Sequence, residues 1–401
     1  MKEKTVEHKL SDFDFSYPEE QVALYPSAKR DESRLLFYNR GNISHHVFKQ
    51  LPELLHEGDF LIFNNSKVVP ARMFCRRKTG AYVEIFLLEP AEGLFQDFLN
   101  DKSGNITFKA LIGNKKRLKE NEVLQVESRM DVFVRIANLQ EGTVELIWND
   151  FSKRLADILS DIALIPLPPY IKRKVEKQDE ETYQTVYGQV PGSVASTTAG
   201  LHFTPQVMES LKTKGVEYDF VTLHVGAGTF LPVKTENVWE HNMHYESFLL
   251  NKSLIEKLLD LKSITAVGTT ALRALESVYW LGVQLIETKK FSNTLSKEFV
   301  FDNLHSNITV DEALTVLLEY FNRQGSQEVV ARTGIFILPG YSFKMVKKLI
   351  TNFHQPKSTL IMLVAAFIGE DWRKVYQEAL DNQYRLFSYG DSSLLVPKKR
   401  I

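Results

Sequence analysis

The sequence predicts a discontinuous α/β domain that is interrupted by a small inserted β-barrel. Residues 70–150 form a succession of short β-branched and aromatic runs, which is typical of a small barrel or sandwich. The remaining chain alternates between strand-like and helix-like segments, the pattern of an α/β domain with a largely parallel sheet. We therefore expect the α/β domain at residues 1–68 and 152–401 and the β-barrel at residues 69–151.

Several runs in the insertion are expected to be strands. Each is rich in β-branched or aromatic residues, and turn formers such as Gly80, Gly104 and Gly142 separate them. The expected strands are Tyr82–Leu88, Ile106–Ile112, Asp131–Ala137 and Thr143–Trp148.

Capping residues mark the first helices of the α/β part. Thr204 and Pro205 combine a capping hydroxyl with a proline at the first helical position, and Gly215 ends that helix. Ser253–Glu256 fits a capping box and predicts the start of the next helix. The apolar run Ile264–Gly268 then predicts a buried strand.

Three more helices follow in the same alternating pattern. One is expected to start at Thr269, a buried one at Ser358 and an amphipathic one at Asp371. Residues 283–330 differ in composition, and we interpret them as an accessory segment without chemical residues. Within that segment an amphipathic helix is expected at about Asp311–Arg323.

The composition is that of an ordinary globular protein, with 44% hydrophobic and 25% charged residues. The longest apolar run, Leu360–Ile368, is far shorter than the roughly 20 residues that span a bilayer. The N-terminus lacks the apolar stretch of a secretory signal. A lone cysteine, Cys75, excludes an internal disulfide and a multi-thiolate zinc site. We therefore expect a cytoplasmic protein with no membrane span.

The net charge of −1 argues against a surface coated in basic residues for binding long duplexes. Local basic clusters still supply phosphate contacts to RNA in many proteins, although each cluster is equally consistent with a solvated loop or chain end. The clusters are Arg76–Lys78, Lys115–Lys119, Lys172–Lys174 and Lys398–Arg400.

Histidines are concentrated in segments that are also dense in glycine, threonine, asparagine and aromatic residues. Imidazoles titrate near neutrality and serve as general acids or bases. A single histidine is more often structural than catalytic, but this density predicts a site. The histidines concerned are His202, His224, His241, His244 and His354.

A metal centre is the rival interpretation of the same residues. His241 and His244 with Glu246, joined by a further histidine, form a plausible ligand set for zinc or iron. However, Tyr245–Leu250 is strand-like, and a strand would turn His241 away from the side shared by His244 and Glu246. We therefore expect no metal.

Two glycine-containing segments are candidates for holding a ligand. Val225–Thr229 follows a strand-like run and resembles half of a dinucleotide fingerprint, without its third glycine and downstream acid. In Gly268–Arg273, a strand, a glycine and two hydroxyls precede a helix N-terminus, which suits a carboxylate or a ribose; a capped helix start is the alternative. The candidate residues are Gly226, Gly228, Thr229, Thr269, Thr270 and Arg273.

Other segments suit an RNA substrate. Arg34 and Arg72 are candidates for clamping phosphates, and surface ion pairs are the alternative. Tyr170 stands beside the cations of Lys172–Lys174, a combination that suits stacking on an unpaired base. Tyr384–Asp391 is another cluster of aromatic, Arg and Asp residues.

Together these segments resemble the S-adenosylmethionine:tRNA ribosyltransferase-isomerase family of the queuosine pathway. The matching stretches run in the family's order over nearly the whole chain, which makes the resemblance highly specific. They are Asp12–Phe15, Ser33–Leu36, Val69–Arg72, Ile165–Arg173, Tyr183–Tyr187, Thr198–Thr204, Thr222–Phe230, His241–Glu246, Val267–Thr270, Leu349–His354, Lys357–Leu360 and Ser388–Asp391.

The resemblance implies a reaction at the wobble base of certain tRNAs, where a deazaguanine carries an aminomethyl group. The ribosyl part of S-adenosylmethionine is transferred to that amine and isomerised, which yields epoxyqueuosine and releases adenine and methionine. The family needs no metal and is similar in having a discontinuous α/β domain with an inserted β-barrel.

This chemistry calls for at least one base and one acid. A sulfonium acidifies its neighbouring C–H, and adenine leaves more readily when it is protonated. The catalytic candidates are His202, His224, His241, His244 and Glu246, with base and acid left unassigned. The wobble nucleotide must be unpaired and splayed, and the candidates for holding it are Arg34, Arg72, Tyr170, Arg173, Asn352, His354 and Asp391.

The chain departs from the family's pattern at several positions. Asn65-Ser-Lys67 replaces Asp-Thr-Arg, Thr197 replaces a proline, Lys347 replaces an acid, and Ser392–Ser393 replace apolar residues. If Asn65 or Lys347 contacts a substrate, the chain is a divergent paralogue with altered specificity. A non-catalytic RNA-binding paralogue and a histidine-based metal-dependent hydrolase are the alternatives. We expect a monomer or a weak oligomer.

Overall fold

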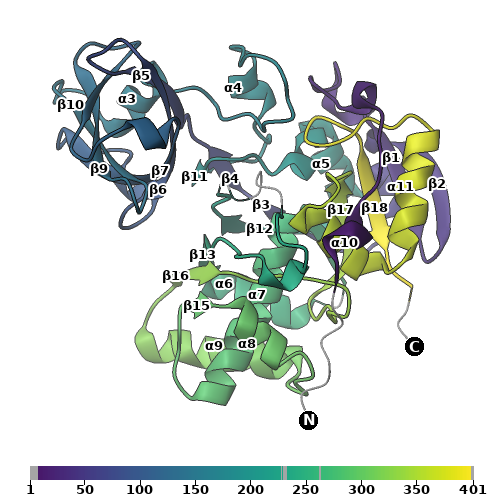
Figure 1. The fold of residues 1–401 in the computed structure, drawn as a ribbon. Helices are drawn as coiled ribbons and strands as arrows, with labels where there is room; N and C mark the ends of the chain where they lie inside the picture. Colours follow the sequence, from purple (N-terminus) through teal and green to yellow (C-terminus); the bar gives the residue numbers. More distant parts are fainter. Residues whose placement is uncertain (1–7, 227, 229–232, 262, 399–401) are drawn as a thin grey trace.

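A large mixed sheet with helices on both faces and a closed β-barrel beside it make up the protein (Figure 1). The structure is a computed structural model that describes residues 8–226, 228, 233–261 and 263–398. The arrangement confirms the predicted fold class, an α/β protein with a small β-barrel. Within the described residues, no helix combines the length and the apolar character that crossing a membrane requires.

The middle of the large sheet is parallel and its flanks are mixed. β12, β3, β14 and β17 are parallel neighbours, while β13 and β18 pair antiparallel to them on either side. In spatial order the described strands are β15 (Thr294–Leu295), β16 (Glu328–Thr333), β13 (Glu246–Asn251), β12 (Glu217–Leu223), β3 (Phe60–Asn64), β14 (Ile264–Val267), β17 (Val346–Asn352), β18 (Ser392–Val396), β1 (Arg34–Asn39) and β2 (Asn42–Val47).

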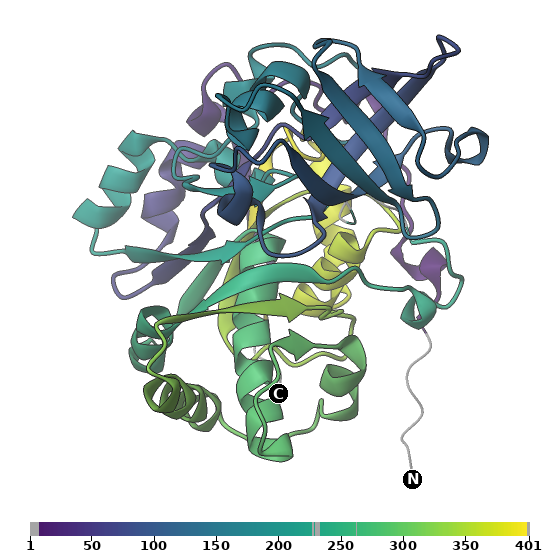
Figure 2. The same ribbon diagram turned by 90° about the vertical axis from the view of Figure 1, so that its left-hand side faces the viewer.

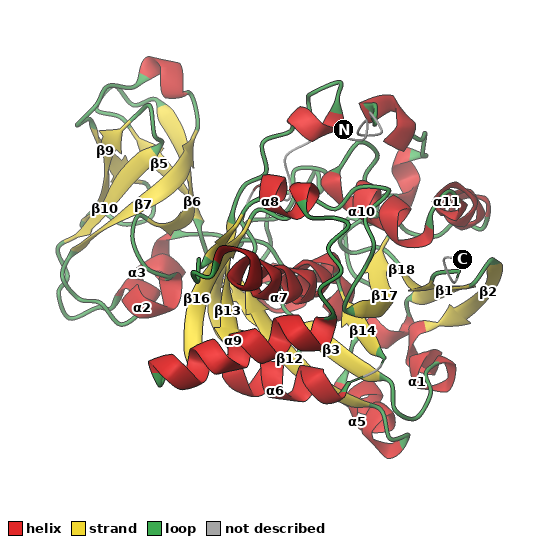
Figure 3. Cartoon of the chain, turned by 90° about the horizontal axis from the view of Figure 1, so that it is seen from below, coloured by secondary structure: helices red, strands yellow, loops and turns green. Residues whose placement is uncertain are grey.

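The central strand β3 shows why the sheet needs cover on both faces. All of its residues are buried, as expected for a parallel strand between two helical layers. Phe60 and Ile62 join the core that contains α7, and Leu61 and Phe63 join the opposite core with α5. Seen from below, α7 lies along one face with α6 and α9 beside it (Figure 3).

Helices and short strands complete the chain. The helices are α1 (Leu51–Leu54), α2 (Phe95–Phe98), α3 (Leu155–Ile162), α4 (Asp179–Thr182), α5 (Pro205–Thr213), α6 (Lys252–Asp260), α7 (Thr269–Thr288), α8 (Lys297–Asp302), α9 (Val310–Gln324), α10 (Thr359–Ile368) and α11 (Asp371–Asp381), and the short strands are β4 (Ser66–Val68) and β11 (Val190–Ser193).

The barrel has its own apolar interior, formed by side chains that alternate along each strand. The four strands expected in the insertion are present, but β5 and β8 were not predicted. Because β4 directly follows β3 and leads into β5, the barrel lies at the sheet edge where α7 begins (Figure 2). Its strands close in the order β10 (Thr143–Trp148), β7 (Asn105–Ile112), β6 (Tyr82–Pro90), β5 (Arg72–Arg76), β8 (Val123–Val126) and β9 (Val132–Asn138).

One local expectation, the position of a helix cap, was wrong. Helix α6 is capped by the Asn251 side chain, which accepts from the backbone N–H of Ser253 at 2.9 Å, so Ser253 is inside the helix and not its cap. The accessory segment 283–330 starts inside α7 and ends in β16, so it is partly built into the sheet. The expected amphipathic helix within it is present as α9.

Candidate active site

The carboxyl ends of β12, β3, β14 and β17 meet at one edge of the sheet. The chain that leaves β3 next enters this part of the sheet at β12, the neighbour of β3 on one side. The chain that leaves β14 next enters it at β17, the neighbour of β14 on the opposite side. The connections thus diverge between β3 and β14. Open α/β sheets bind ligands at the carboxyl ends of strands at such a switch point.

A cleft of about 670 Å³, partly open to solvent, lies at this edge. Its walls come from the residues that follow β12, β14 and β17, from the segment before the 3₁₀ helix Thr198–His202, and from the turn at Phe387 and Ser388. The lining residues that the structure describes include no Lys, Arg, Asp or Glu. Hydroxyls, one imidazole, amides and aromatic rings therefore make the cleft polar but uncharged.

Five of the residues selected from the sequence line this cleft: Tyr170, Thr269, Thr270, Asn352 and His354. Tyr170 and the two threonines come from segments far apart in the chain. The strand–glycine–helix pattern and the Asn-Phe-His motif therefore line the same cleft.

Tyr170 contributes an aromatic wall. Its ring packs on Phe387 with ring centroids 5.0 Å apart, and its hydroxyl lies 2.5 Å from Ser388 Oγ. Burial raises the pKa of Tyr170 to about 12, so the phenol stays protonated. The ring supplies a flat apolar surface, as stacking on a base requires.

His354 is the imidazole among the described lining residues. Its Nε2 lies 2.7 Å from Thr351 Oγ1, and its backbone N–H donates to the Tyr376 hydroxyl at 2.8 Å. Burial lowers the pKa of His354 to about 3, so it is neutral near pH 7.

His202 lies behind the cleft wall and reaches the cleft through Asn352. The Ser33 hydroxyl donates to the Arg30 carbonyl at 3.1 Å, so Ser33 Oγ accepts from His202 Nδ1 at 2.7 Å. His202 Nε2 is then the acceptor for Asn352 Nδ2 at 3.4 Å. Burial lowers the pKa of His202 to about 4, in keeping with this neutral tautomer.

The same chain of hydrogen bonds orients the groups that face the ligand. With Nδ2 directed at His202, Asn352 Oδ1 accepts from the Thr198 hydroxyl at 2.8 Å. The hydroxyl hydrogen of Thr198 is therefore donated to Asn352, and the hydroxyl oxygen keeps lone pairs that accept hydrogen bonds from the cleft. The cleft wall at Thr198 therefore suits an N–H or O–H donor of a substrate.

Glu246 and Arg273 form a buried ion pair next to the cleft. Arg273 Nη1 donates to Glu246 Oε2, and Gly226 N–H donates to Glu246 Oε1 at 3.2 Å. Within the described part of the chain, Arg273 Nε and Nη2 have no hydrogen-bond partner. Arg273 is one turn along α7 from Thr269, so its charge lies close behind the cleft.

The remaining histidine candidates are not among the described residues that line the cleft. His224 packs against Gly192, where an added Cβ would be 2.5 Å from its Nδ1, and burial lowers the pKa of His224 to about 4. His241 and His244 lie in the loop before β13, and the His244 ring contacts Gly228. Burial also lowers the pKa of His241. The catalytic roles of these residues stay predictions.

The charged side chains that were candidates for binding RNA make contacts within the protein itself. Arg34 donates to the Asn382 carbonyl, Arg72 donates to Glu84 at 2.6 Å, and Arg173 forms a bidentate pair with the buried Asp179 at 2.6 and 2.7 Å. The Asp391 carboxylate accepts the backbone N–H groups of Arg34 and Arg385. Their contacts with RNA stay predictions. One selected cofactor residue, Thr229, lies outside the described residues.

Sequence reasoning missed several lining residues. Thr198 and Ser388 are in motifs that carried the family resemblance, but neither was selected as a site residue. The signal available in the sequence was a hydroxyl side chain two residues before a glycine, which occurs in both motifs. The described residues contain no group of three His, Cys, Asp or Glu placed to hold a metal ion.

Fold and site together define a class: a discontinuous α/β protein with an uncharged, hydroxyl-rich ligand cleft at a topological switch point and an inserted β-barrel beside it. A family model described as "Queuosine biosynthesis protein" matches residues 10–395. The chain belongs to the S-adenosylmethionine:tRNA ribosyltransferase-isomerase family of queuosine biosynthesis. This confirms the family indicated by the sequence motifs.

Named relatives match over nearly their full length. The S-adenosylmethionine:tRNA ribosyltransferase-isomerase of Legionella pneumophila (strain Paris) is 41% identical over 96% of this chain and 99% of its own. That of Sulfurihydrogenibium sp. (strain YO3AOP1) is 40% identical over 97% and 100%. A crystal structure of S-adenosylmethionine tRNA ribosyltransferase from Thermotoga maritima is 28% identical over 96% of this chain and 100% of its own, with a TM-score of 0.46.

Proposed function

We propose that this enzyme transfers and isomerises the ribosyl part of S-adenosylmethionine onto the aminomethyl-deazaguanine at the tRNA wobble position. The product is epoxyqueuosine, and adenine and methionine are released. The observation that carries this proposal is the 41% identity to a named ribosyltransferase-isomerase over 96% of the chain. We also propose a cytoplasmic enzyme that works without a metal, as a monomer or a weak oligomer.

The cleft suits such substrates because it offers hydrogen bonds without fixed charge. Thr198, Asn352 and the α7 start present acceptors and donors for a ribose or a base, and Tyr170 presents a flat ring. We propose that His354 helps to hold the wobble base as a neutral imidazole, because burial lowers its pKa to about 3. The general base and the general acid stay unassigned.

The departures from the family's pattern mostly avoid the cleft. Asn65 Oδ1 accepts from the Thr222 hydroxyl at 2.7 Å inside the protein, and Lys347 is exposed and donates to the Lys344 carbonyl. Of the departing residues that the structure describes, Thr197 lines the cleft. The geometry thus favours the standard activity over a paralogue with a remodelled site.

The decisive experiment follows adenine release. The purified enzyme, S-adenosylmethionine and a tRNA that carries the aminomethyl-deazaguanine should give one free adenine for each modified tRNA, with a matching increase in the mass of the wobble nucleoside. A tRNA with guanine at that position is the matched control and should give none. Retained tRNA binding without adenine release would favour a non-catalytic paralogue instead.

A further inference from the structure

Helix α7 begins at the cleft without a side-chain cap. Gly268 occupies the N-cap position with φ of +90°, and no side chain accepts from the first-turn N–H groups in the described structure. The first N–H groups of a helix have no partner within the helix. Thr269, Thr270 and Ala271 are all buried, so solvent does not replace the missing cap.

A second observation independently indicates a missing ligand at this helix end. The Thr270 side chain is 8% exposed and lines the cleft. Its Oγ1 is inaccessible to solvent and has no hydrogen-bond partner among the residues that the structure describes. A buried hydroxyl without a partner is costly, and a bound acceptor would satisfy it.

The charge around this helix end favours an anion. Aligned peptide dipoles give a helix N-terminus a partial positive charge, and α7 is a long helix of 20 residues. The described lining residues carry no Asp or Glu to neutralise that charge and no Lys or Arg to compete for an anion. His354 is neutral near pH 7. The start of α7, with the Arg273 charge close behind it, is therefore an electropositive feature of the cleft.

We infer that the N-terminus of α7, with Thr269 and Thr270, binds the carboxylate of the methionyl part of S-adenosylmethionine. The inference rests on the proposed function and gives the substrate an orientation, with its amino-acid end against α7. A tRNA phosphate is also an anion, but the nucleotide chain continues from it on two sides. A terminal carboxylate fits a helix end whose first residues are more than nine-tenths buried.

A charge substitution at the first helical position tests the site. Thr269→Asp adds a negative charge at the first helical position, where the helix dipole offsets part of the cost of burying it, and thermal melting checks that the variant folds. Thr269→Asn is the matched neutral control. Compared with Thr269→Asn, we expect Thr269→Asp to weaken S-adenosylmethionine binding about tenfold, measured by titration calorimetry without tRNA. Equal dissociation constants for the two variants would overturn the inference.

Decarboxylated S-adenosylmethionine provides the second arm of the experiment. The wild type should bind it about tenfold more weakly than S-adenosylmethionine, and the Thr269→Asp variant should lose this preference. If Thr269→Asp instead raises KM for tRNA and leaves the affinity for S-adenosylmethionine unchanged, the helix end binds a phosphate and the carboxylate assignment is wrong. Absence of adenine release by the wild type would contradict the proposed function and leave these binding ratios measurable.

Discussion

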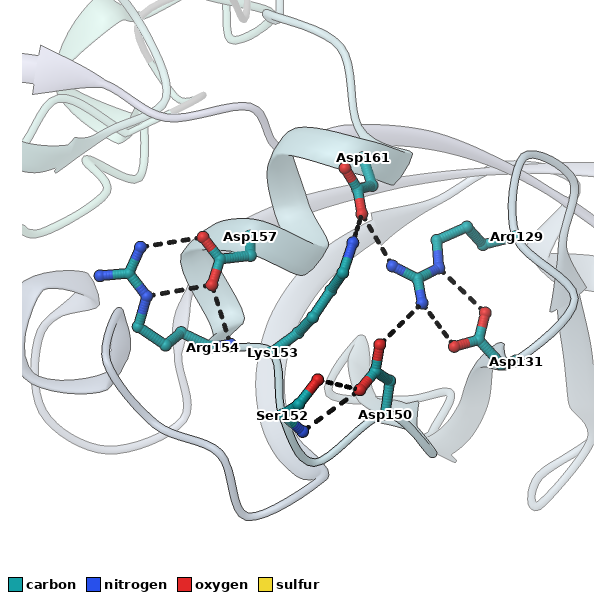
Figure 4. A network of polar contacts seen from close by, with 8 residues as sticks. All are labelled: Arg129, Asp131, Asp150, Ser152, Lys153, Arg154, Asp157 and Asp161. Atoms are coloured by element: carbon teal, nitrogen blue, oxygen red, sulfur yellow. Dashed lines mark hydrogen bonds and ion pairs between the residues drawn. The ribbon is translucent and has the colours of Figure 1, made fainter.

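In the barrel, Arg129 contacts Asp131, Asp150 and Asp161 (Figure 4). In the cleft, by contrast, the Thr270 hydroxyl contacts no described partner. Both regions are polar, but the charged groups of the Arg129 network are paired within the chain, whereas the Thr270 hydroxyl is not. A satisfied network contributes to stability, while an unsatisfied buried group detracts from it until a ligand binds. We propose that this difference separates a network that stabilises the fold from a hydroxyl that a bound substrate would satisfy.

The two regions also differ in how their titratable groups respond to folding. On the barrel side, hydrogen bonds from Arg154 lower the pKa of Asp157 to about 2. At the cleft, burial lowers the pKa of His202 to about 4 and that of His354 to about 3. The barrel thus stabilises charged forms, and the cleft stabilises neutral ones.

The largest expected effect is loss of cleft stability in mild acid. Burial lowers the pKa of His202 from 6.5 to about 4, so between these values the unfolded chain binds more protons and stability falls as pH falls. His202 alone accounts for about 3 kcal/mol over this window. Asp157 loses most of its contribution only below its unfolded pKa of 3.8.

Hydrogen–deuterium exchange, corrected for the intrinsic effect of pH, measures this difference. Between pH 6.5 and 4.5, peptides that cover 198–203 and β17 should lose protection while barrel peptides keep it. The His202→Gln variant, which cannot titrate, should lose less. Equal losses in barrel and cleft would show that the histidines do not set the acid response.

The next effect distinguishes positioning from proton transfer at His202. Glutamine retains one donor for Ser33 and one acceptor for Asn352, so His202→Gln should keep kcat/KM within about threefold. His202→Ala leaves the Asn352 amide with the Asp391 carbonyl, at 3.5 Å, as its remaining acceptor and should lower kcat/KM about tenfold to a hundredfold. The pH–rate profile of His202→Gln should match the wild type. A His202→Gln variant as inactive as His202→Ala would make His202 a proton carrier.

Much of the fold was predictable because its signals are local. The start of α7 at Thr269 follows from a strand, a glycine and two hydroxyls in sequence. Strand β8 was missed because Val123–Val126 is only four residues long and carries a polar glutamine, so its pattern is too short. The cap of α6 was misplaced because Asn251 and Ser253 both cap helices well, and the choice depends on where β13 ends.

The site was predictable only in part because its roles depend on tertiary contacts. Thr269 and Asn352 were found through local motifs. Arg173 was selected for its nearness to Tyr170 in sequence, but its guanidinium is held by the buried Asp179. Thr198 was overlooked because its use as an acceptor depends on Asn352, more than a hundred residues away.

A smaller effect is expected from the satisfied network of the barrel. Arg129→Gln leaves three carboxylates close together and should lower the free energy of unfolding by about 1–2 kcal/mol. Adenine release per folded enzyme should be unchanged, because no residue of this network lines the cleft. Lys153→Gln is the control, since Lys153 pairs with Asp161 alone in the described network, and should cost less. A change in KM without a change in the free energy of unfolding would contradict the assignment of the Arg129 network to stability alone.

The smallest expected effect is a gain in stability from removing a cleft hydroxyl. Thr270→Val replaces an unsatisfied buried hydroxyl by a methyl group and should stabilise the free enzyme by up to about 1 kcal/mol. Thr265→Val is a closely matched control, because Thr265 is fully buried on β14, its hydroxyl also lacks a described partner, and it does not line the cleft. Thermal melting without ligand should show a similar gain for both variants, whereas only Thr270→Val should weaken S-adenosylmethionine binding. If both variants weaken binding equally, the Thr270 hydroxyl is merely structural and the contrast between cleft and barrel loses its functional meaning.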